Sequence, residues 1–250
     1  MQAISRMTTG RMAQRATAEA LGTALLLSAV VGSAVMAERL SGGNAALALL
    51  ANAAATGAAL LALLLALGPI SGAHLNPAVT LALASQGRLP WREAPVYLLA
   101  QFTGGVAGVV LAHAMFGLPA FSISTQVRAG APQLLGEAVA TFGLLAVIFG
   151  CSRHPPGLVA FAVAAYITAA YWFTSSTSFA NPAVTLARAF TNSWAGIRPV
   201  DVPGFVLAQA VGAATATALF RWLLPRGADE AAAQAPMPAA GKCSATSQGP

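Results

Sequence analysis

Charged residues are scarce in this sequence: they make up 8% of its 250 residues, whereas hydrophobic residues make up 57%. This balance is too apolar for a soluble domain of that length. The shortage of charge therefore excludes a soluble globular protein and indicates a chain that is embedded in a lipid bilayer.

Cysteine is also rare. The two cysteines, Cys151 and Cys243, fall at the end of an apolar run and near the end of the chain. Such isolated thiols provide neither a disulfide framework nor the ligand spacing of a metal site. No segment carries a catalytic signature, so we expect a protein that is not an enzyme and has no metal and no cofactor.

Six apolar runs are long enough to cross a hydrocarbon core about 30 Å thick as helices. The first follows three arginines in the manner of a signal peptide, but it is too long and lacks a clear cleavage pattern, so we interpret it as an uncleaved span. The six runs cover residues 18–37, 45–68, 94–116, 133–151, 156–174 and 203–224.

The basic residues predict the orientation in the membrane. Their net excess of +6 is scattered at the ends of the apolar runs and forms no patch interleaved with aromatic residues, which argues against nucleic-acid binding. Six spans place both termini on one side, and nine of the 13 basic residues lie on that side, which predicts cytoplasmic termini. An Ala-rich composition with twelve Arg to one Lys favours a bacterial inner membrane.

One short motif is repeated. The seven residues Asn-Pro-Ala-Val-Thr-Leu-Ala that begin at Asn76 recur without a gap at Asn181, 105 residues later. Asn is a favoured N-cap and Pro is tolerated at the first helical position, so a helix should begin at each motif. Each apolar stretch lasts only about ten residues, or roughly 15 Å of helix, which predicts two half-spanning helices.

The duplication extends beyond the motif. Glu19-Ala20 is matched by Glu137-Ala138, and Ala100-Gln101 by Ala208-Gln209. Each copy has three spans, an odd number, so the two copies should enter the membrane in opposite orientations as an inverted repeat. The predicted parts are a cytoplasmic N-terminus (1–17), a first repeat (18–116), a connecting loop (117–132), a second repeat (133–224) and a disordered cytoplasmic tail (225–250).

This pattern predicts chemistry at the midplane. The side-chain amides of Asn76 and Asn181 can donate hydrogen bonds to a passing solute, while the positive N-terminal ends of the two half-helices repel protons and cations. Glu19 and Glu137 are the acidic residues within the spans, where an unpaired carboxylate costs about 2.5–3.5 kcal/mol. We expect both to brace the extended segments before the half-helices, with a proton relay as the alternative.

With its two Asn-Pro-Ala motifs, Asn76-Pro77-Ala78 and Asn181-Pro182-Ala183, the sequence resembles the aquaporin and glycerol-facilitator family of membrane channels over about residues 15–225. The resemblance implies a homotetramer with one pore per subunit. It also implies, position by position, a selectivity filter formed by four residues, Thr56, Ala169, Ser178 and Val184.

The filter departs from the common family pattern at Val184, where most members have an arginine. In this the sequence resembles some bacterial relatives that carry valine there and are associated with arsenic resistance, which implies neutral arsenic acids as a cargo. Arg188 lies on nearly the same helical face, seven residues after Asn181, and is the alternative source of a cation at the outer mouth.

The sequence thus predicts an all-α membrane protein with six transmembrane helices and two half-spanning helices. Its predicted function is a passive channel for water and small neutral polar solutes, with glycerol-like molecules and neutral arsenic or other metalloid acids as cargoes. Two alternatives remain open: an ion-coupled secondary transporter, since broken helices in inverted repeats also build those, and a structural membrane protein with a closed pore.

Overall fold

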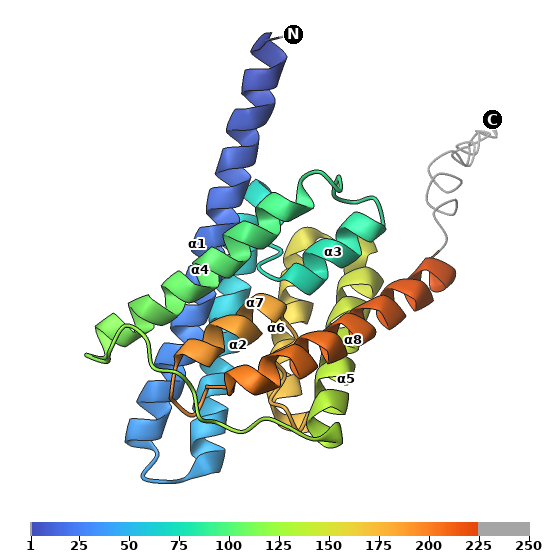
Figure 1. The fold of residues 1–250 in the computed structure, drawn as a ribbon. Helices are drawn as coiled ribbons and strands as arrows, with labels where there is room; N and C mark the ends of the chain where they lie inside the picture. The colour runs from blue at the N-terminus through green and yellow to red at the C-terminus, as the bar shows by residue number, and fades with distance from the viewer. Residues whose placement is uncertain (1, 225–250) are drawn as a thin grey trace, which may run out of the picture.

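Eight α-helices run through the part of the chain that the structure, a computed structural model, describes: the backbone of residues 2–224 and the side chains of residues 11–224. Six are long and two are short (Figure 1). The long helices are α1 (Gln2–Leu40), α2 (Ala45–Ser71), α4 (Ala94–Met115), α5 (Ala131–Gly150), α6 (Pro156–Phe173) and α8 (Val202–Leu223), and the short ones are α3 (Pro77–Ser85) and α7 (Pro182–Ala187).

The predicted architecture is confirmed: six helices are long and apolar enough to span a membrane, and both short helices begin at their Asn-Pro pairs. Two differences concern length. Helix α1 extends well past the predicted span at residues 18–37, because the polar residues before it are also helical, and its N-terminal end projects beyond the other helices (Figure 1). Helix α7 has six residues and then tightens into the 3₁₀ turn η2 (Arg188–Phe190). The predicted tail at 225–250 lies outside the described residues.

Local sequence explains where the helices end. Asn44 caps α2 by accepting a hydrogen bond from the amide of Leu47 at 3.0 Å. At the other end Gly72 adopts φ +91°, a left-handed conformation that residues with a Cβ rarely adopt, and its amide bonds to Gly68 O. The chain thereby leaves α2 and turns back into the protein toward Asn76.

The helices pack as two related halves. In the first, α1 lies against α2 and α4; in the second, α5 lies against α6 and α8. The halves meet where α2 packs on α6, and each short helix also touches a long helix of the other half, α3 on α8 and α7 on α4. The inverted repeat therefore places both short helices inside the bundle, among the longer helices (Figure 1).

Close helix contact within each half depends on glycine. A Cβ at Gly104 of α4 would collide with the backbone of Ala20 in α1, and one at Gly212 of α8 with the backbone of Ala138 in α5. Ala20 and Ala138 directly follow Glu19 and Glu137, so these contacts also fix the depth of the two carboxylates.

We expect Gly104→Ala to reduce the yield of folded protein strongly, because backbone cannot move aside as a flexible side chain can. Gly68→Ala is the matched control, since a Cβ there meets nothing within 4 Å. Size-exclusion chromatography of the detergent-solubilised variants measures the yield. Equal yields for the two variants would contradict the proposed backbone clash.

Candidate functional site

Two extended segments lead into the short helices and have matching backbone conformations. Ala73 and Leu75 have φ of +46° and +49°, and Ser178 and Ala180 have φ of +50° and +47°. The pairs are 105 residues apart, the same offset as the motifs. Left-handed conformations in residues with side chains are strained and persist only where neighbouring contacts hold them, so these segments need support from the rest of the protein.

Glu19 of α1 gives this support in the first half. Its Oε1 accepts hydrogen bonds from Ser71 Oγ at 2.7 Å and from the amide of His74 at 2.9 Å. Its Oε2 accepts from the amide of Leu75 at 2.7 Å and from Gln101 Nε2 of α4 at 2.8 Å. Glu19 is fully buried, so its charge is compensated by these four donors.

Glu137 of α5 is placed in the same way in the second half. Its Oε1 accepts from the amide of Phe179 at 2.8 Å, and its Oε2 accepts from the amide of Ala180 at 2.9 Å and from Gln209 Nε2 of α8 at 2.6 Å. Gln209 also donates to Thr185 Oγ1 of α7 at 2.8 Å. Each buried carboxylate thus ties an extended segment to two long helices, and a chain of hydrogen bonds continues into the short helix.

The two asparagines face each other across the repeat. Asn76 Oδ1 caps α3 by accepting from the amide of Ala78 at 2.9 Å, and Asn181 Oδ1 caps α7 in the same manner. Asn76 Nδ2 donates to Ala180 O at 2.8 Å, and Asn181 Nδ2 donates to Leu75 O at 2.7 Å. Each Nδ2 has two hydrogens, so one N–H remains for a solute.

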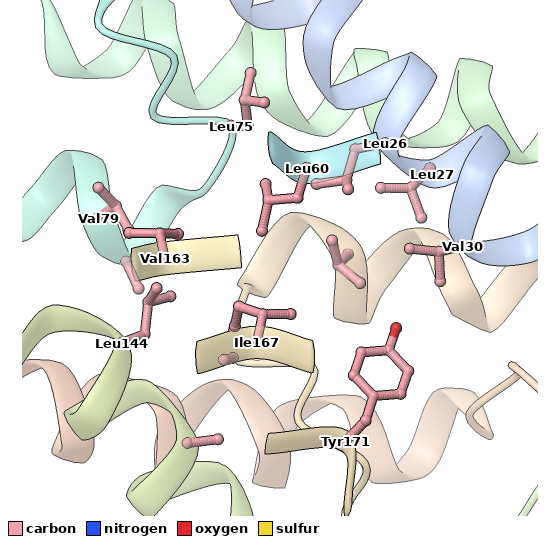
Figure 2. Close-up of a cluster of buried hydrophobic side chains, with 14 of the residues drawn as sticks. Leu26, Leu27, Val30, Leu60, Leu75, Val79, Leu144, Val163, Ile167 and Tyr171 are labelled. Atoms are coloured by element: carbon pink, nitrogen blue, oxygen red, sulfur yellow. The ribbon is translucent and has the colours of Figure 1, made fainter. Parts of the chain in front are cut away.

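A cavity of about 740 Å³ runs past both asparagines. One end of the cavity is lined by Arg88, from the loop after α3, and by His154, from the loop before α6. The other end is lined by Ser178 and Arg188. Between them the wall is largely apolar: Figure 2 shows aliphatic side chains gathered around one space, together with the hydroxyl of Tyr171. The labelled residues that line the cavity are Leu26, Val30, Leu60, Leu75, Val79, Leu144, Val163, Ile167 and Tyr171.

Three of the four expected filter residues line this cavity: Thr56, Ser178 and Val184, all buried. The expectation for Ala169 is wrong. Ala169 is exposed, on the outer face of α6 that also carries the exposed Trp172, and is not among the cavity-lining residues. The opposite face of α6 points inward, and there Tyr171 donates a hydrogen bond to Thr56 Oγ1 at 3.3 Å.

Arg188 also lines the cavity and is only 2% exposed. Its Nε donates to Ala195 O, and its guanidinium carbon lies 3.4 Å from the centre of the Phe179 ring. The guanidinium of Arg128, from the loop after α4, lies 4.9 Å from the centre of the same ring. Phe179 therefore holds two cations near one end of the cavity.

Arg128 is held by acceptors on three sides. Burial lowers the pKa of Arg128 to about 10, while Glu137 acts in the opposite direction, so the side chain remains charged at neutral pH. Its guanidinium donates to the backbone carbonyls of Gly196, Trp194 and Ser176.

Sequence reasoning missed Gln101, Gln209, Tyr171 and the Phe179–Arg128 contact as parts of the site. The two glutamines had a signal, since their dipeptides are duplicated, but nothing in the sequence aligned them with the glutamates. Tyr171 and Arg128 are not duplicated, and their positions depend on how α6 and the loop after α4 fold back.

The sequence model described as "Major intrinsic protein" matches residues 6–158. The chain belongs to the major intrinsic protein family. This confirms the family that the paired Asn-Pro-Ala motifs predict.

Named relatives agree with this membership. The chain is 56% identical to aquaglyceroporin AqpS of Rhizobium meliloti (strain 1021), covering 85% of this chain and 91% of that protein. It is 35% identical to the probable aquaporin AqpM of Archaeoglobus fulgidus, covering 85% and 97% respectively. The X-ray structure of the aquaglyceroporin from Plasmodium falciparum matches the fold with a TM-score of 0.67 at 20% identity, over 86% of this chain and 98% of that one.

Proposed function

We infer that this member of the major intrinsic protein family is a passive channel for water and small neutral solutes such as glycerol. The observation that carries the proposal is that both motif asparagines line one and the same cavity. Its walls are mostly aliphatic, and its polar groups include the two amides and the N-terminal ends of α3 and α7. Such a path offers hydrogen bonds to an uncharged solute and opposes cations.

The proposal also covers the transported solutes, the oligomeric state and the membrane. Thr56, Ser178 and Val184 have small or medium side chains, which leaves room for glycerol-sized molecules and for neutral arsenic or other metalloid acids. We propose a homotetramer with one pore per subunit in a bacterial inner membrane, with both termini in the cytoplasm. Exposed apolar residues on the long helices, among them Leu99 and Leu207, support a surface that meets lipid or a neighbouring subunit.

Glu19 and Glu137 do not favour the ion-coupled alternative. All their carboxylate oxygens accept hydrogen bonds from backbone amides or neutral side chains, and these bonds hold the extended segments in place. A coupled transporter would need an ionisable group that changes partners during transport. We propose a bracing role for both carboxylates.

Proteoliposomes containing the wild-type protein should take up water and glycerol down a gradient and should pass no measurable proton or ion current. Stopped-flow light scattering measures solute entry, and a pH-sensitive dye inside the vesicles measures proton entry. Uptake that requires a proton or sodium gradient would establish a coupled transporter instead. A correctly folded protein that passes no solute at all would establish a closed pore.

A further inference from the structure

Arg188 is a buried cation whose hydrogen-bonding capacity is only partly used. Its Nε donates to Ala195 O, but its two terminal nitrogens, Nη1 and Nη2, have no acceptor among the described residues. The side chain is 2% exposed and lines the pore cavity. A buried guanidinium with free donors is costly unless a ligand or water in the cavity satisfies it, so these two nitrogens are available to a ligand that enters the cavity.

The charged groups around Arg188 have a net positive charge, which favours the binding of an anion. Arg128 adds a second cation at the same aromatic ring, Phe179. The neighbouring carboxylates are already engaged, since Glu137 accepts from backbone amides and Asp201 pairs with Arg198. Two arginines against Glu137 leave a net charge of +1 near this end of the cavity.

Further donors line the same cavity. Ser178, the residue before Phe179, is one of the lining residues, and its buried hydroxyl has no hydrogen-bond partner among the described residues. Thr56 accepts from Tyr171, so its own hydroxyl hydrogen is free to donate. Because Nε is occupied, the guanidinium can offer its two terminal nitrogens together, a geometry that matches the two oxygens of a carboxylate.

We propose that Arg188, assisted by Ser178, forms an anion site within the pore that binds a small planar oxyanion of the carboxylate type. The bound anion lies across the path between Arg188 and the asparagines and therefore blocks the passage of neutral solutes. Binding itself requires only the cavity and its donors. The blocking effect rests on the proposed channel function.

Formate, the smallest carboxylate, is the probe. Isothermal titration of the full-length protein in detergent at pH 7, with a constant sodium chloride background, should show saturable binding. Arg188→Gln should weaken it at least about tenfold, since hydrogen bonds to a charged group typically contribute that much or more. Arg188→Lys keeps the charge but loses the pair of terminal nitrogens that can donate together. Its affinity for formate should therefore lie between that of the wild type and that of Arg188→Gln.

Arg39→Gln is the matched control, because Arg39 is exposed at the end of α1, where it donates to Phe116 O and lies over the Phe116 ring, and it is not among the cavity-lining residues, so formate affinity should be unchanged. If Arg188→Gln does not fold, Ser178→Ala replaces it, with a smaller loss of affinity expected. Wild-type protein that transports glycerol but binds no formate overturns the anion site and leaves the channel function standing. Formate binding with equal affinity in the wild type and in Arg188→Lys and Ser178→Ala overturns it too.

The blocking effect has its own readout. Formate added to both sides of glycerol-transporting proteoliposomes should reduce glycerol entry in the wild type and in Arg39→Gln, but not in Arg188→Gln. If formate binds in detergent and glycerol entry is absent from all proteins, the channel function fails while the anion site stands. If formate binds and glycerol entry is unaffected, the site lies off the path and the blocking claim is wrong.

Discussion

Replacing Glu19 with glutamine is expected to reduce the yield of folded protein to a small fraction of the wild-type level. Each oxygen of Glu19 accepts two hydrogen bonds, and in glutamine one oxygen becomes an NH₂ group that can only donate. Two buried donors then lose their acceptor at about 1–3 kcal/mol each. A typical domain is stable by only about 5–15 kcal/mol, so a loss of roughly 2–6 kcal/mol is severe.

Glu137→Gln should behave similarly, because its oxygens serve the matching segment of the second half. Glu38→Gln is the control, since Glu38 is exposed and accepts a long hydrogen bond, 3.4 Å, from the amide of Trp194. Fluorescence-detected size-exclusion chromatography compares the yields. If Glu19→Gln folds normally and its solute flux loses its response to pH, the proton-relay interpretation is right and the bracing interpretation is wrong.

Much of the fold could be predicted because membrane burial constrains sequence so strongly. Within lipid every backbone polar group must be satisfied internally, so spans have a fixed minimum length and apolar composition that can be recognised directly. The half-helices were predictable for a local reason: Asn76-Pro77 and Asn181-Pro182 specify helix starts by capping chemistry alone. The 105-residue repeat then related the two halves.

The site could be predicted only in part because several contacts depend on tertiary structure. Counting residues from Asn181 placed Ala169 in the pore, but α6 turns that residue outward and brings Tyr171 to Thr56 instead. The stack of Arg188 and Arg128 on Phe179 joins two loops and a helix end, and no local pattern encodes it. Periodicity determines which residues share a helical face, whereas the rotation of that face toward the pore is set by packing.

Val184→Arg is expected to block glycerol-sized solutes while reducing water flux only modestly. Val184 of α7 is 4% exposed and lines the cavity, four residues before Arg188 of η2, so a longer side chain has to occupy the pore itself. Loss of space for a single methylene in a fitted pocket already changes selectivity about tenfold or more, and arginine adds several heavy atoms. Water can pass through a narrower opening than glycerol can, and it can form hydrogen bonds with the added donors as it passes.

Val184→Met separates the effect of side-chain size on glycerol entry from the effect of charge, because methionine adds length without donors or charge. We expect glycerol entry to fall at least about tenfold in Val184→Arg and less in Val184→Met, because the new guanidinium also repels that of Arg188 and keeps both side chains extended across the path. Stopped-flow light scattering on proteoliposomes with matched protein content measures water and glycerol entry together. Unchanged glycerol entry in Val184→Arg, alongside a rise in Arg188→Ala, would assign the constriction to Arg188 and remove Val184 from the filter.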